Sequence, residues 1–265
     1  MNVNNLESVF PGEWPRSGPG EEPRNYRHPI AWSSGFEPMS VPDLFARGVE
    51  LGGTKKVVDF YGRRTSYLEM AADVQRVAHA LQRAGVGKGD RVGLFLPNVP
   101  VYLAAYYGIM TAGATAVNFS PLYTVEELAA QVADSGVTML FTIDSSALLP
   151  TALEVLECSA LERLVVQGLA DMLPRVKSAL LRIVGRSQLT AIPEDPRVVR
   201  YDRFVAGCDK PTPVAIDPMS DIALLQYTGG TTGVPKGAML THQNITANAR
   251  QTLRVDGHRG QRDIM

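Results

Sequence analysis

The sequence predicts an α/β fold in which a mostly parallel sheet carries helices on both faces. Short apolar runs such as RVGLFLP and VTMLFTI alternate with longer stretches whose apolar residues recur at helical spacing. Strands that are apolar throughout are typical of a sheet buried on both sides, and the intervening helices supply the cover. With 265 residues, 45% of them hydrophobic, the chain is long enough to bury a substantial core.

Two of the expected helices carry the same start and stop signals. The stretches 66–85 and 124–136 each begin with serine or threonine followed three residues later by glutamate, and each closes at a glycine. This is the pattern of a capping box at the first turn and a glycine stop at the last. Strands are expected at RVGLFLP, VTMLFTI and RLVVQG, with a further helix from about Ser145 to Cys158.

The segment from Val92 to Val125 contains no charged residue and could be mistaken for a membrane span. Prolines and asparagines interrupt it near both ends and leave a helical piece of only about a dozen residues, which is too short to cross a bilayer. We therefore interpret it as a buried strand, a helix and a second strand.

The chain divides into an extended leader at 1–38, rich in proline and glycine, and one α/β domain over 39–265. Within that domain, a basic helical excursion is expected near 169–195. Its apolar residues recur at helical spacing, with four basic residues among them: Arg175, Lys177, Arg182 and Arg186. Such a helix can contact a membrane surface, or it can pack on its own domain with its arginines in solvent.

Composition narrows the classes of partner. The formal net charge of -1 gives no electrostatic reason to expect nucleic acid as a partner. Cys158 and Cys208 lack metal-binding spacing and do not suggest a disulfide framework, and the N-terminus lacks the features of a secretory signal. We expect a cytoplasmic protein, with peripheral contact to the inner face of a membrane as an open alternative.

One turn is unusually rich in glycine, threonine and lysine. It lies in QYTGGTTGVPKGAML, between the buried-strand pattern DIALLQY and a second such pattern, GAMLTH. Glycines allow successive backbone N–H groups to turn toward one anion, threonines add hydroxyl donors, and Lys236 adds positive charge. Ligands of α/β sheets collect outside the carboxyl ends of strands, so the turn is expected to bind phosphate. A plain hairpin turn would not require three hydroxyls and a lysine.

Other nucleotide and catalytic motifs do not occur. The turn does not have the spacing of a Walker A loop, and the sequence lacks G-x-G-x-x-G, G-x-S-x-G and H-E-x-x-H. His242, directly after the turn, can either reach a phosphate or simply begin a helix.

The run YTGGTTGVPKGAMLTH resembles the signature phosphate-binding loop of the adenylate-forming (AMP-binding) superfamily, with Gly229 in place of the commoner serine. The resemblance extends from about Met39 to the end of the chain. Its phrase NFSPLYT is most similar to medium- and long-chain fatty-acyl-CoA synthetases. The resemblance implies the N-terminal part of the adenylate-forming fold, with the C-terminal domain absent from this chain.

The resemblance also implies a reaction and its site residues. A carboxylic acid, most simply a fatty acid, would be activated by ATP and Mg²⁺ as an acyl-adenylate and then transferred to coenzyme A. Lys236 would be the catalytic residue, offsetting phosphate charge. The residues around the phosphates would be Thr228, Gly229, Gly230, Thr231, Thr232, Gly233 and Lys236. No metal ligand is assigned, because the family's parts that hold magnesium, adenine and ribose follow the loop.

Several alternatives remain open at this level. The acid could be aromatic, a dicarboxylate or an amino acid, and the acceptor could be the thiol of a carrier protein. The chain could also be a non-catalytic nucleotide-binding remnant. Because family members are roughly twice as long as this chain, we expect an incomplete sequence that is inactive by itself.

Overall fold

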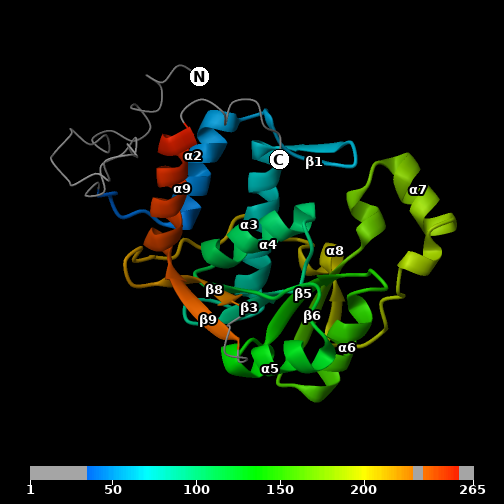
Figure 1. The fold of residues 1–265 in the computed structure, drawn as a ribbon. Coiled ribbons are helices and arrows are strands. Elements are labelled where there is room, and N and C mark those ends of the chain that lie inside the picture. Colours follow the sequence, from blue (N-terminus) through cyan, green and yellow to red (C-terminus); the bar gives the residue numbers. More distant parts are fainter. Residues whose placement is uncertain (1–34, 229–234, 257–265) are drawn as a thin grey trace, which may run out of the picture.

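The computed structural model describes residues 35–228 and 235–256, and its center is a seven-stranded sheet (Figure 1). The strand order is β7-β6-β5-β3-β4-β8-β9, and every neighbouring pair is parallel except β8 and β9. A separate antiparallel hairpin, β1-β2, stands apart from this sheet. The predicted mostly parallel α/β fold is confirmed.

The strands are short and the helices fill the intervals between them. The strands are β1 Lys56–Phe60, β2 Arg63–Ser66, β3 Arg91–Leu94, β4 Thr115–Asn118, β5 Met139–Ile143, β6 Arg163–Gln167, β7 Val198–Arg200, β8 Ile222–Thr228 and β9 Lys236–Thr241. The α-helices are α2 Val41–Gly52, α3 Tyr67–Arg83, α4 Pro100–Thr111, α5 Val125–Ser135, α6 Leu149–Cys158, α7 Arg175–Ile183, α8 Tyr201–Phe204 and α9 His242–Asp256.

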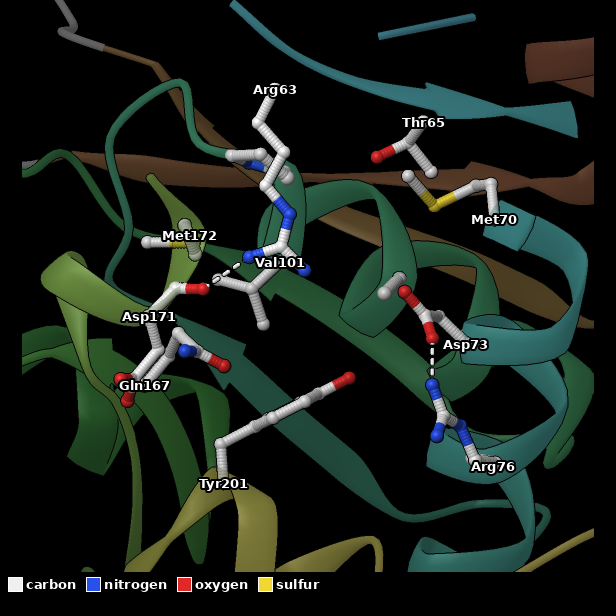
Figure 2. Close-up of a pocket in the computed structure, with 12 residues that line it drawn as sticks. Arg63, Thr65, Met70, Asp73, Arg76, Val101, Gln167, Asp171, Met172 and Tyr201 are labelled. Carbon is white, nitrogen blue, oxygen red and sulfur yellow. Dashed lines mark hydrogen bonds and ion pairs between the residues drawn. The ribbon is translucent and has the colours of Figure 1, made fainter. Parts of the chain in front are cut away.

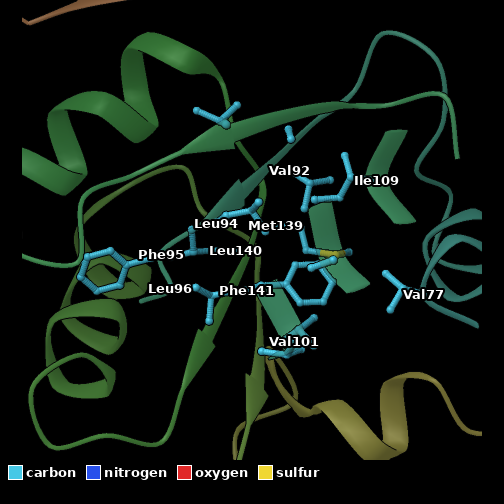
Figure 3. Close-up of a cluster of buried hydrophobic side chains, with 14 of the residues drawn as sticks. Val77, Val92, Leu94, Phe95, Leu96, Val101, Ile109, Met139, Leu140 and Phe141 are labelled. Atoms are coloured by element: carbon cyan, nitrogen blue, oxygen red, sulfur yellow. The ribbon is translucent and has the colours of Figure 1, made fainter. Parts of the chain in front are cut away.

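Helices cover both faces of the sheet. In Figure 1, α3 and α4 lie on one face and α5 and α6 on the other. The core between these layers is aliphatic and aromatic, and β3 and β5 supply much of it, including the fully buried Val92, Leu140 and Phe141 (Figure 3). Because these central strands are covered on both sides, almost all of their residues are apolar.

The two capping boxes predicted at helix starts are formed by hydrogen bonds in the structure. The Ser66 backbone N–H donates to the Glu69 carboxylate (2.6 Å), and the Glu69 N–H donates to the Ser66 hydroxyl (3.2 Å). Thr124 and Glu127 form the same pair of bonds at the start of α5. Both capping boxes are confirmed, and each satisfies helix N–H groups that have no partner within the helix.

The uncharged segment 92–125 forms β3, α4 and β4, as predicted. No helix among the described residues is both long enough and apolar enough to cross a membrane. The helix expected from about Ser145 begins later, at Leu149. Ser145 instead forms a β-bridge with Leu189, and Pro150 occupies the first turn of α6, where proline is best tolerated.

The second strand of the loop hairpin differs from the expectation. GAMLTH has the pattern of a buried strand like DIALLQY, but β9 lies at the edge of the described sheet and Met239 is 69% exposed. Apolar composition alone does not distinguish a buried strand from an edge strand, since burial depends on what packs against the strand.

Two elements near the N-terminus were missed. The β1-β2 hairpin turns at Tyr61 and Gly62, which both have positive φ, as a type I′ hairpin turn requires. Helix α2 begins after Ser40, whose hydroxyl accepts the Asp43 N–H at 3.1 Å. Both signals were present in the sequence: Tyr-Gly between a β-branched run and an arginine pair, and serine before proline and aspartate.

The side chains of α9 hold the backbone that leads into α2, and Figure 1 shows the two helices side by side. Residues 36–41 include the end of the predicted leader, whose first 34 residues lie outside the described chain. Four side chains of α9 make the bonds to this segment: His242, Gln243, Thr246 and Arg250. The segment before α2 and the helix after the loop therefore form one unit, although about 200 residues separate them.

Helices α3 and α4 approach closely at Gly108, and this contact gives a stability prediction. A Cβ on Gly108 would lie 2.6 Å from Val77 Cγ1. Alanine normally gains about 1 kcal/mol over glycine in a helix, but overpacking costs roughly 1–3 kcal/mol. We expect Gly108→Ala to lower the free energy of unfolding by about 1 kcal/mol in urea denaturation. Gly87→Ala, with no atom within 4 Å of the new Cβ, is the control and should leave it nearly unchanged.

A second prediction concerns His242. Its Nδ1 accepts the Val41 N–H at 3.2 Å, which requires an unprotonated Nδ1, and burial lowers the pKa of His242. As pH falls below about 6.5, the unfolded chain binds a proton that the folded chain does not, so stability falls. His242→Asn keeps an acceptor and removes the titration. Between about pH 7.5 and 5.5 the variant should lose less unfolding free energy than the wild type. Equal losses would contradict the role of the imidazole.

Candidate functional site

The glycine- and threonine-rich turn connects β8 to β9 at the carboxyl end of β8. Thr228, the last residue of β8, pairs across the ladder with Lys236, the first residue of β9. The Thr228 hydroxyl lies 3.5 Å from the Lys236 carbonyl oxygen, and both residues are exposed. The register thus brings the first and last of the predicted phosphate-binding residues together at one edge of the sheet.

Five of the predicted phosphate-binding residues lie outside the described chain: Gly229, Gly230, Thr231, Thr232 and Gly233. Their assignment stays a prediction from the sequence. What is described is the base of the hairpin on which they are carried, from Ile222 to Thr228 and from Lys236 to Thr241.

Lys236 offers a charge for an anion. Its side chain forms no ion pair with any other residue in the described part of the chain, unlike Lys88, which lies 2.7 Å from Asp221. An exposed ammonium with hydroxyl donors nearby can bind phosphate oxygens by charge-assisted hydrogen bonds.

Contacts of Tyr227 on one face of the sheet hold the end of β8 in place. Its ring stacks on Phe119 at a centroid distance of 6.2 Å, and its hydroxyl donates to the Asp134 carboxylate of α5 at 2.5 Å. Burial, followed by the hydrogen bond to Asp134, raises the pKa of Tyr227, so the phenol keeps its proton and remains a donor. A large buried side chain therefore anchors the end of β8 next to the exposed Thr228.

On the opposite face of the sheet, hydrogen bonds between polar side chains hold β8 in place. The Tyr102 hydroxyl of α4 donates to Asn118 Oδ1 (3.0 Å), and Asn118 Nδ2 donates to Gln226 Oε1 (2.9 Å). These bonds join α4, β4 and β8 just before the turn. Sequence reasoning missed this network. Its one available signal was the polar pair of Asn118 and Gln226 at the ends of two otherwise apolar strands.

His242 begins α9 and is buried. Its Nδ1 is engaged with Val41, and Thr241 caps the helix by accepting the Asn244 N–H at 3.2 Å. Of the two interpretations left open for His242, the structure favours the start of a helix over a phosphate ligand.

A pocket of about 190 Å³ lies elsewhere at the carboxyl edge, between α3, α4, β6 and α8 (Figure 2). The Tyr201 phenol points into it, and burial raises the pKa of Tyr201. Its charged groups are already engaged: Arg76 pairs with Asp73, and Arg63 donates to the Asp171 carbonyl. An ion already paired within the protein offers less to a phosphate than Lys236 does.

The chain is similar to known proteins over most of its length. The family model described as AMP-binding enzyme matches residues 45–265. A long-chain-fatty-acid–CoA ligase of Bacillus subtilis (strain 168) is 40% identical over 200 residues, which are 73% of this chain and 35% of that protein. The ligase of the same name from Escherichia coli O157:H7 is 36% identical, over 80% of this chain and 38% of its own.

Solved structures agree on the fold. The crystal structure of a long-chain-fatty-acid-CoA ligase from Archaeoglobus fulgidus has a TM-score of 0.67 at 29% identity and covers 85% of this chain and 41% of its own. A benzoate CoA ligase from Burkholderia xenovorans LB400, at 19% identity and a TM-score of 0.62, covers 80% and 36%. This chain thus spans well under half the length of the proteins it matches. With the family model matching 221 residues from 45 to 265, the chain belongs to the AMP-binding enzyme family.

Proposed function

We propose that this chain is part of an AMP-forming acyl-CoA ligase, which uses ATP to activate a carboxylic acid as acyl-adenylate and then transfers the acyl group to coenzyme A. The observation that carries the proposal is the family match over 45–265, which includes the turn between Thr228 and Lys236. The proposed reaction draws on ATP and coenzyme A, so we propose the cytoplasm as its location.

The residues of the turn act on the phosphates of ATP in this proposal. Pyrophosphate leaves when the carboxylate attacks the α-phosphate, and negative charge builds on the leaving group. In the proposed reaction Lys236 offsets that charge, while the Thr228 hydroxyl and the turn from Gly229 to Gly233 donate hydrogen bonds to the β- and γ-phosphates. No side chain of this chain has to act as a nucleophile, because the acid itself attacks.

The described residues fit the phosphate better than they fit a metal. No group of three or more histidine, cysteine, aspartate or glutamate side chains among them could hold an ion. Mg²⁺ would therefore be held mainly by phosphate oxygens and by residues beyond those described. Coenzyme A is proposed as the acceptor from the family, without assigned residues.

A fatty acid is the proposed substrate class. The relatives that are 33–40% identical are named long-chain-fatty-acid–CoA ligases, and they cover 66–80% of this chain. An aromatic acid is the second candidate, because 4-coumarate–CoA ligase-like 9 of Oryza sativa is 32% identical over 81% of the chain. The phosphate-binding role of the turn is the same for both acids.

The role of Lys236 can be tested on the chain itself with inorganic tripolyphosphate. A hydrogen bond to a charged group contributes roughly 1.5–3 kcal/mol, and 1.4 kcal/mol corresponds to tenfold in affinity. Titration calorimetry should therefore show at least about tenfold weaker binding for Lys236→Ala. Lys210→Ala removes another exposed lysine, remote in sequence from the turn, and should bind like the wild type. Equal affinity of Lys236→Ala and wild type would overturn the assignment.

A separate measurement addresses catalysis. Purified on its own, the chain should show no fatty-acid-dependent exchange of pyrophosphate into ATP, because the family's groups for magnesium, adenine and ribose follow the turn. The Bacillus subtilis relative, assayed in parallel, is the positive control. Measurable exchange by the 265-residue chain would show that these residues suffice for adenylation. It would contradict the proposal that adenylation also needs the groups that follow the turn.

A further inference from the structure

Helix α7 exposes an apolar face. It belongs to the connection between β6 and β7, which also contains the short 3₁₀ helices Leu169–Met172 and Arg186–Gln188. Four large apolar side chains at helical spacing are in solvent: Val176 (81% exposed), Leu180 (58%), Ile183 (78%) and Val184 (74%). We call these four residues the α7 apolar face. Figure 1 shows α7 projecting at one end of the molecule.

The orientation of α7 is fixed by contacts to the rest of the protein. The Lys177 ammonium donates to the Tyr61 carbonyl at 2.9 Å and lies 5.7 Å from the centroid of the Tyr61 ring. Arg182 forms an ion pair with Asp171. Ser178 and Leu181 are half-buried, on the side of the helix away from the apolar face. These contacts hold α7 so that its apolar side chains point outward.

The charged residues of α7 and of the segment that follows it are all basic. From Met172 to Pro193 the sequence contains four basic residues and no acidic one, although the whole chain has a net charge of -1. Arg175 and Arg186 are exposed and form no ion pair within the described chain. A second copy of α7 would bring these cations against each other, which disfavours self-association through this face.

We propose that α7 docks the protein on an anionic lipid surface, with the α7 apolar face at the boundary between headgroups and acyl chains. A short helix with a basic flank and a large apolar face lies in the plane of such an interface. Basic residues beside it are attracted to the negative surface potential, and the exposed Tyr61 next to Lys177 is of the type enriched at membrane interfaces. Nine helical residues are far too few to span the bilayer.

This surface is separate from the phosphate-binding turn. Strands β7 and β9 form opposite edges of the sheet, and α7 belongs to the connection that enters β7. Docking through α7 thus leaves the β8-β9 hairpin accessible. If the proposed substrate is a fatty acid, which partitions into membranes, docking brings the protein to it; this consequence rests on the proposed function, whereas the docking itself does not.

Co-sedimentation of the 265-residue chain with vesicles tests the proposal. The vesicles are phosphatidylcholine alone, or phosphatidylcholine with about 30% phosphatidylglycerol. We expect binding to the anionic vesicles, weaker binding to the neutral ones, and loss of the difference at high salt. Leu180→Gln/Ile183→Gln should lower the bound fraction at least about fivefold. Arg175→Gln/Arg186→Gln should weaken binding to the anionic vesicles and reduce its salt dependence.

The control is Leu51→Gln/Met219→Gln, which removes two exposed apolar side chains outside α7 and should bind like the wild type. Thermal unfolding of every variant should match the wild type, since all the replaced side chains are exposed. Absence of wild-type binding to anionic vesicles would overturn the proposal, as would unchanged binding by Leu180→Gln/Ile183→Gln. A dimer that this variant converts to a monomer, without any effect on lipid binding, would show that a second copy covers the face instead.

Discussion

The register between β8 and β9 is the constraint on which the site depends. A slip of one residue would turn every side chain of a strand to the opposite face of the sheet. Here Tyr227 is held by Asp134 on one face, and Gln226 is held by Asn118 on the other. These contacts fix the end of β8, and the β8-β9 ladder then places Lys236 opposite Thr228. The contacts of β8 and the ladder together determine where the ends of the turn lie.

The parts of the fold that sequence reasoning identified are those with local signals. The capping box of Ser66 and Glu69 involves residues three positions apart, and Gly136 ends α5 with φ of 67° through its own backbone freedom. The same holds for the site: the residue types from Thr228 to Lys236 indicate phosphate without any knowledge of the fold. The resemblance to the family in the sequence likewise rests on that turn and on the motifs before it, which are local patterns.

What the sequence did not reveal depends on distant partners. The bond between His242 and Val41 joins residues 201 positions apart, and nothing near either residue identifies the other. Asn118 and Gln226 likewise meet only because β4 and β8 are parallel neighbours. The exposure of β9 could not be read from its apolar residues, since an edge strand and a central strand can share a composition. These features follow from tertiary packing, which a single sequence does not display.

A net charge of -1 conceals two cationic regions with different chemistry. Lys236 is one charge in a turn of glycine and threonine, which suits a small and highly charged anion. Helix α7 combines several charges with four exposed apolar side chains, which suits a broad amphipathic surface. Six strand spacings separate β7 from β9, roughly 29 Å, whereas salt screens exposed charges beyond about 8 Å. Neither region can therefore take over the binding role of the other. The ligand that each region binds depends on the groups immediately around it.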